Sequence, residues 1–290
     1  MTARMRLHTI AACLAALAAL APRSPAAAQT TTGNSFQWTG RIPAGAIIRV
    51  FTADGEITVT PANGDQAEVH GERRDDRPGY RALAFKMLQD GANVTVCAYD
   101  PDYGSCSADG VSGESHRGHS ERTARASFDV KLPAGVKIIT KSGDGNVDIR
   151  GAPGGADVSA STGDGEIRIE GATGAVTAST GNGPVTIATG VGPVNASSGD
   201  GPIEVRVGTM PHPQDMRIRT GDGPITLYIP STFGGELDAH TGDGHIESDF
   251  PLQVSGRMDP SHVRATIGSG GTTRIELSTG DGDVHLRPNR

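Results

Sequence analysis

A four-residue motif repeated along the C-terminal half constrains the fold of this chain more than any other feature. The motif consists of Ser or Thr, Gly, Asp or Asn, and Gly. It begins at Ser142, Thr162, Thr180, Ser198, Thr220, Thr241 and Thr279, with a degenerate copy at Thr52. Short alternating segments such as Val158-x-Ala160 and Ile167-x-Ile169 flank the motif. Alternation with a period of two is typical of a strand with one buried face, so the pattern predicts units of strand, turn, strand and turn.

One such unit is too small to fold alone. It buries a few aliphatic side chains at ~1.5–3 kcal/mol each, against ~1–2 kcal/mol of backbone entropy per ordered residue. Stacking solves this problem, because each coil then bonds to its neighbours and the inner faces form one core. We therefore expect an all-β fold, a β-solenoid or β-helix of stacked short coils with two strands per repeat. A twisted antiparallel meander is the alternative, since every strand ends in a hairpin-like turn.

The alternation also assigns the core and the turn chemistry. We expect the following aliphatic residues to point inward: Ile167, Ile169, Val176, Val185, Ile187, Val194, Ile203 and Val205. Glu166, Arg168 and Glu204 should be exposed. The glycines of the motif are expected to supply positive φ, and its Asp to accept a hydrogen bond from a nearby backbone N–H.

The repeated Asp residues raise the alternative of a calcium site. Calcium takes six to eight oxygen ligands, whereas each coil offers one carboxylate. Asn182 occupies one of the Asp positions without a charge. We therefore expect no metal site and no cofactor.

The first 28 residues have the pattern of a secretory signal peptide. Arg4 and Arg6 precede the apolar segment 10–20, which is too short to span a bilayer, and small residues at 26–28 offer a cleavage site before Gln29. No later segment is apolar enough to cross a membrane. Cleavage would remove three arginines and no acid, so the formal charge would move from −7 to −10. A surface with this negative net charge argues against nucleic-acid binding. The sequence predicts an exported protein that is periplasmic, extracellular or on the cell surface.

The chain divides into three parts on this interpretation. The signal peptide covers 1–28, an N-terminal β region covers 29–135, and the repeat solenoid covers 136–290. Cys97 and Cys106 are the two cysteines after the signal peptide, and an even pair in an exported protein is typical of a disulfide. We expect this bond to contribute about 2–3 kcal/mol and to tether a polar, exposed loop over about 97–122.

Four ionisable residues form the one candidate surface patch. His245, Glu247, Asp283 and His285 occupy outward positions after two of the turns. If their strands are neighbours, the four side chains could hold zinc or form a proton-transfer pair. A solvated ladder of complementary pairs is the plainer interpretation, and the segment 250–271 could separate the strands. The sequence contains no recognisable catalytic centre, so we predict that the protein is not an enzyme.

Three parts of the sequence resemble a known family. They are the segment 128–136 leading into Ser142-Gly143-Asp144-Gly145, the repeated Thr-Gly-Asp-Gly, and a closing region made of 245–251, 265–271 and 279–282. This pattern resembles a bacterial putative-adhesin family of unknown function. The resemblance implies a β-solenoid fold and an exported location, and it carries over no catalytic residues. The 97–122 loop departs from the short connection usual in the family.

The leading functional hypothesis is an exported cell-envelope structural or interaction protein. It would present a polar solenoid face to a polymer or to another, unidentified envelope partner. A carbohydrate-active β-helix enzyme and a ligand-free scaffold are the alternatives. The scarcity of aromatic residues, at 4%, counts against the enzyme, because such enzymes often use aromatic stacking platforms. The oligomeric state stays open.

Overall fold

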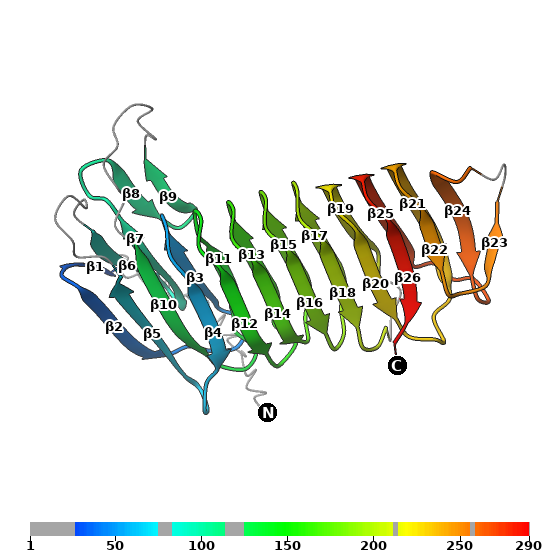
Figure 1. Cartoon of the computed structure of the whole chain (residues 1–290). Coiled ribbons are helices and arrows are strands. Elements are labelled where there is room, and N and C mark those ends of the chain that lie inside the picture. The colour runs from blue at the N-terminus through cyan, green and yellow to red at the C-terminus, as the bar shows by residue number, and fades with distance from the viewer. Residues whose placement is uncertain (1–26, 75–82, 114–124, 211–213, 256–258, 290) are drawn as a thin grey trace, which may run out of the picture.

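The protein is an elongated stack of short strands in two long sheets (Figure 1). The computed structural model describes residues 27–74, 83–113, 125–210, 214–255 and 259–289. The predicted signal peptide lies outside the described residues up to position 26. Within the described ranges, no helix is long and apolar enough to cross a membrane.

The strands of the described residues form a 13-stranded sheet, an 11-stranded sheet and a separate two-stranded hairpin. Sheet A, in spatial order, consists of β1 (Ala27–Thr32), β6 (Ala84–Asp90), β7 (Asn93–Tyr99), β3 (Ile47–Thr52), β11 (Lys137–Lys141), β13 (Val158–Thr162), β15 (Val176–Thr180), β17 (Val194–Ser198), β19 (Met216–Asp222), β25 (Arg274–Asp281), β21 (Gly235–Asp243), β24 (His262–Ile267) and β23 (Leu252–Val254). Sheet B consists of β2 (Ser35–Arg41), β5 (Gln66–Arg73), β10 (Ala126–Leu132), β4 (Ile57–Pro61), β12 (Val147–Ala152), β14 (Ile167–Ala172), β16 (Val185–Thr189), β18 (Ile203–Val207), β20 (Ile225–Ile229), β26 (Val284–Pro288) and β22 (Ile246–Ser248). The hairpin is β8 (Gly104–Ser107) with β9 (Gly110–Gly113).

Each central repeat places one strand in sheet A and the next in sheet B. Successive repeats pair in parallel with like residues side by side, so Val158 lies opposite Val176, and Val176 opposite Val194. The predicted β-solenoid is confirmed. The antiparallel meander is wrong for the repeats, because each turn carries the chain across the core to the other sheet rather than back along the same sheet.

The two sheets enclose one hydrophobic core that runs from Phe36 to Leu286. All eight aliphatic residues predicted to point inward are at most 1% exposed. Glu166 and Arg168 are exposed as predicted, whereas Glu204 is half-buried. The sequence alternation therefore identifies the inner face correctly in the repeats.

The turns are held by the Ser or Thr of the motif, not by its Asp. The Thr180 hydroxyl donates to the Gly165 carbonyl of the preceding coil at 2.9 Å and accepts the Gly183 N–H at 3.2 Å. Ser198 repeats both bonds one coil later, at 2.8 Å and 2.9 Å. The Asp cap predicted from the sequence is thus replaced by a buried hydroxyl, which lies nearer to the coil axis than the outward carboxylate does.

The glycines of the motif serve close packing more than positive φ. Gly183 is not in the left-handed region, yet a Cβ there would overlap the Gly165 carbonyl of the coil beneath it. Positive φ occurs at only some copies, such as Gly223 at 136° and Gly282 at 149°. The prediction of positive φ throughout the motif is therefore wrong for the central coils.

The order of the coils departs from the order of the chain at both ends. The last coil, β25 and β26, lies between the coil of β19 and β20 and the coil of β21 and β22 (Figure 1). At the other end, β3 and β4 lie between β7 and β10 on one side and β11 and β12 on the other. Antiparallel strands then close the stack, with β5 and β6 at one end and β24 at the other. These covers protect backbone groups that would otherwise form open sheet edges.

The N-terminal region contains the predicted disulfide. Cys97 on β7 is bonded to Cys106 on β8, with Cα atoms 5.9 Å apart. Of the exposed loop predicted over 97–122, the described part instead contains the hairpin of β8 and β9, which packs with Phe51 and Tyr99 in a small second core. The remainder of that loop lies outside the described residues. The boundary predicted between 135 and 136 is bridged by the parallel pairing of β3 with β11.

Candidate functional site

The inserted final coil brings the predicted surface patch together. Because β26 pairs with β22, Glu247 lies opposite His285 on the outer face of sheet B. His285 Nδ1 is 3.1 Å from Glu247 Oε2, and His245 Nδ1 is 3.5 Å from Asp283 Oδ1. The segment 250–271 does not separate the strands, since β23 and β24 lie at the end of the stack.

The four residues form two separate His–carboxylate pairs. The His245 backbone N–H donates to Asp283 at 2.9 Å, and this bond lowers the pKa of the Asp283 carboxyl. Slight desolvation acts in the opposite direction, and the nearby His245 and His285 side chains lower the pKa further. Across the residues that the structure describes, no group of three His, Cys, Asp or Glu side chains is placed to hold a metal ion. The geometry is that of a ladder of complementary pairs on an open face.

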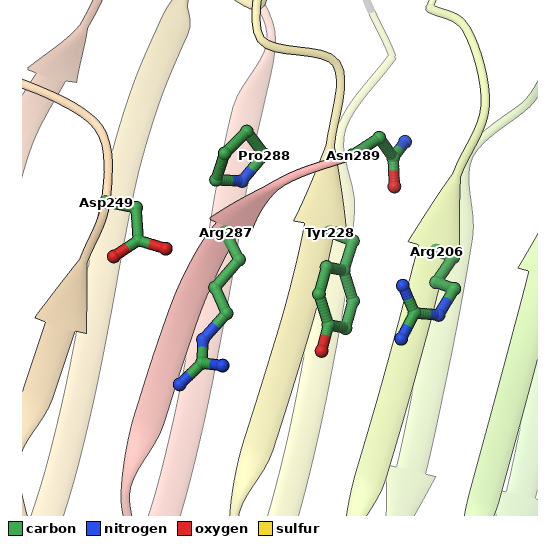
Figure 2. Close-up of a pocket in the computed structure, with 6 residues that line it drawn as sticks. All are labelled: Arg206, Tyr228, Asp249, Arg287, Pro288 and Asn289. Atoms are coloured by element: carbon green, nitrogen blue, oxygen red, sulfur yellow. The ribbon is translucent and has the colours of Figure 1, made fainter.

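A groove of about 530 Å³ lies next to these pairs on the same face of sheet B. It is lined by Arg206, Tyr228, Asp249, Arg287, Pro288 and Asn289 (Figure 2). Arg206, Tyr228 and Arg287 come from β18, β20 and β26, and the strand registers place them in one row across the sheet. Arg287 stands two residues beyond His285, so groove and patch form one continuous surface.

Tyr228 is held against the guanidinium group of Arg206. The Arg206 Cζ lies 3.6 Å from the centroid of the Tyr228 ring, which is a cation–π contact. The same guanidinium is bonded to Glu204, with Nε 3.0 Å from Oε1. These two contacts fix the position of the aromatic ring on an otherwise flexible surface.

The charge pattern of sheet B changes at the groove. Several strands carry an acid and an arginine two residues apart, which neutralise each other, as in Asp148–Arg150 on β12 and Glu204–Arg206 on β18. Strand β26 carries His285 and Arg287 at the equivalent positions instead. Arg287 is exposed and forms no ion pair with any described residue. The groove therefore has a guanidinium group available for a ligand.

Sequence reasoning did not identify the groove residues. Alternation counted from Ile225 and Val284 places Tyr228 and Arg287 on the outer face, and this signal was present in the sequence. The sequence does not show that β20 and β26 are neighbours, because 54 residues (230–283) separate them along the chain. Only the inserted coil makes these strands adjacent.

A second groove, of about 280 Å³, lies on the outer face of sheet A. Its arginines already have partners: Arg217 is 2.8 Å from Glu276, and Arg274 is 3.2 Å from Asp238. Hydrogen bonds from Arg219 lower the pKa of the Glu276 carboxyl, outweighing its partial burial with the help of Arg217. This surface is neutralised within the protein, in contrast to the groove on sheet B.

Proteins of known structure that are similar to this chain include two that are described as adhesion proteins. One is a putative cell adhesion protein from Clostridium sporogenes ATCC 15579, at 12% identity, with 88% of this chain and 100% of that chain covered and a TM-score of 0.36. The other is a putative adhesin from Bacteroides fragilis NCTC 9343, at 11% identity, with coverage of 88% and 97% and a TM-score of 0.36. At these values the likeness carries no argument about function. None of the curated proteins matches the chain.

The family comparison is more informative, because it covers most of the solenoid. The Toastrack DUF4097 family matches residues 48–287, which extend from β3 to β26. The family resemblance seen in the sequence is thereby confirmed, and the chain belongs to the Toastrack DUF4097 family.

Proposed function

We propose that this protein is an exported, adhesin-like interaction protein of the cell envelope that binds an extended polymer along the outer face of sheet B. The observation that carries the proposal is a pair of outward rows that stay in register from β12 to β26, beside and within the Tyr228 groove. Every residue of these rows is polar except Ala188 on β16. Parallel strands about 4.8 Å apart make this surface long and flat. Solenoids use extended surfaces of this kind to contact partners.

Two features support export. The first 28 residues have a signal-peptide pattern, and Cys97 and Cys106 are bonded, as is usual in oxidising compartments. The test is mass spectrometry of the protein recovered from the envelope fraction or medium of the producing cells. A chain beginning near Gln29 is expected, and an exported chain that retains Met1 would contradict the proposal.

Binding is tested on a glycan array with purified protein beginning at Gln29. We expect retention of one class of polysaccharide, with competition by the same soluble polymer. Absence of binding to every glycan would count against a polymer-binding role and leave the ligand-free scaffold as the better interpretation.

The carbohydrate-active enzyme is kept as a second candidate on one observation. The His285–Glu247 pair lies beside Tyr228 and Arg287, so a base, an acid and an arginine share one surface. Incubating each bound polymer with the protein and measuring new chain ends distinguishes the two functions. Chain ends that increase with time, and that are lost in His285→Ala, would establish the enzyme in place of the interaction protein.

A further inference from the structure

We propose that the Tyr228 groove binds the carboxylate of an acidic saccharide unit. This inference rests on the proposed function and specifies the class of polymer that the sheet B face recognises. Three features of the groove support it: the donors that converge there, the unpaired guanidinium group of Arg287, and the carboxylate of Asp249 at one end.

The donors converge from three adjacent strands. Figure 2 shows the Tyr228 ring between the guanidinium groups of Arg206 and Arg287. The Arg206 guanidinium group is already ion-paired with Glu204, whereas Arg287 has no ion-pair partner among the described residues. A guanidinium group presents a planar fork of N–H donors that fits a carboxylate, and the phenol adds another donor. The geometry therefore suits an oxyanion seated on Arg287 beside Tyr228.

One cationic group of the groove is not neutralised by a neighbouring carboxylate. The sequence has a formal net charge of −7, and the arginines Arg150 on β12 and Arg206 on β18 are each paired with an acid of their own strand. On β26 the acid is replaced by His285, which is paired with Glu247, and Arg287 forms no ion pair with a described residue. An unpaired guanidinium group on an acidic protein attracts a single anionic group, while the surrounding carboxylates repel dense negative charge. This combination favours a ligand whose charges are spaced apart.

Asp249 makes the same distinction at close range. It lines the groove beyond Arg287, on the side away from Tyr228 (Figure 2), and is exposed. A carboxylate can accept hydrogen bonds from sugar hydroxyls, but it repels a second anion. A saccharide with one carboxylate per unit can place that carboxylate on Arg287 and its hydroxyls on Asp249. Polyphosphate has no hydroxyl groups to donate along its chain, and its charges would be repelled by Asp249.

The experiment measures binding of polygalacturonate, of the same polymer with its carboxylates methyl-esterified, and of inorganic polyphosphate. The acid form should bind, the ester should bind at least about tenfold more weakly, and binding should weaken as salt is raised. Equal binding of acid and ester, or equal or tighter binding of polyphosphate, would overturn the assignment.

Two variants connect the affinity to the groove. Arg287→Gln should weaken polygalacturonate binding at least about tenfold, because it removes a charged donor. Arg150→Gln is the matched control, since Arg150 is exposed in the same row but is paired with Asp148 and lies away from the groove. Thermal melting of both variants checks that each is folded.

The outcomes separate this inference from the proposed function. If the wild-type protein binds a neutral polymer and Arg287→Gln binds it equally well, the anion site is wrong and the interaction role stands. If no polymer binds in any arm, both are wrong.

Discussion

At the scale of single residues, the motif hydroxyl is the most consequential atom of the repeat. Thr180 and its equivalents are buried, with the Thr180 residue 5% exposed, and each links its own turn to the coil beneath. Burying a hydroxyl is favourable only when its hydrogen bonds are satisfied. This series of hydroxyl hydrogen bonds, the hydroxyl ladder, therefore couples the geometry of each turn to the stacking of the coils.

Replacing this hydroxyl with a methyl group tests the ladder. Thr180→Val keeps the shape of the side chain but leaves the Gly165 carbonyl and the Gly183 N–H without their partner. We expect a loss of about 1–3 kcal/mol in the free energy of unfolding, measured by denaturant titration. Thr177→Val on the same strand is the control, because Thr177 is exposed, and it should change stability little.

The outward Asp residues of the motif repel one another. Partial burial raises the pKa of the Asp144 carboxyl, and the neighbouring Asp54 and Asp164 raise it further, against the attraction of Arg125. In one slot the repulsion is relieved, since the Asn182 amide donates to Asp164 at 2.5 Å. The charged form of Asp144 is therefore a cost to the folded state.

Asp144→Asn should make the protein more stable at neutral pH, by less than about 1 kcal/mol because the side chain is exposed. A raised pKa means that the folded state gains a proton more readily than the unfolded state. The advantage of the variant should thus disappear as the pH falls below 3.8, the ordinary value for Asp. Unfolding titrations at several pH values measure it, and an advantage that grows in acid would contradict this account.

At the scale of the coil, glycine sets how closely the turns stack. A Cβ at Gly183 would overlap the Gly165 carbonyl, whereas a Cβ at Gly190 would meet its nearest atom at 3.8 Å. Neither residue is in the left-handed region, so the contrast between them isolates packing from backbone conformation.

Gly183→Ala is expected to lower the free energy of unfolding by about 1–3 kcal/mol, because the coils must separate locally to admit the methyl group. Gly190→Ala should be close to neutral, since its methyl group would make ordinary contacts. Calorimetric melting of the two variants compares them directly. A similar loss in both would mean that glycine acts through chain flexibility instead.

At the scale of the whole molecule, one Asp or Asn per coil forms a column along the corner of the solenoid. Asp222, Asp281 and Asp243 are successive members, because β25 lies between β19 and β21. With strands about 4.8 Å apart, each gap offers about two oxygen-bearing side chains, well below the six to eight ligands of calcium.

We therefore expect that calcium does not stabilise the protein. Melting temperatures in chelator and in millimolar calcium should agree once ionic strength is matched with sodium. A real site, saturated a hundredfold above its dissociation constant, would add ~2.7 kcal/mol. A large upward shift specific to calcium would show that the column binds metal.

The repeated motif and its alternation determined much of this architecture from the sequence. They identified the solenoid, the inward aliphatic residues and the family, and the cysteine pair indicated the disulfide. These features are local or periodic, so a single unit contains the information. The turn chemistry was assigned to the wrong residue, because the sequence does not show which of the motif's polar groups faces the coil beneath.

Only the tertiary structure decided which coils are neighbours. Near-identical coils offer near-identical surfaces, so the repeat alone does not distinguish stacking in chain order from insertion of the last coil between two earlier ones. In the folded sheets the last coil is inserted, with β25 between β19 and β21 and β26 between β20 and β22. The candidate site follows from it, since Tyr228 meets Arg287, and Glu247 meets His285, only because β26 lies between β20 and β22.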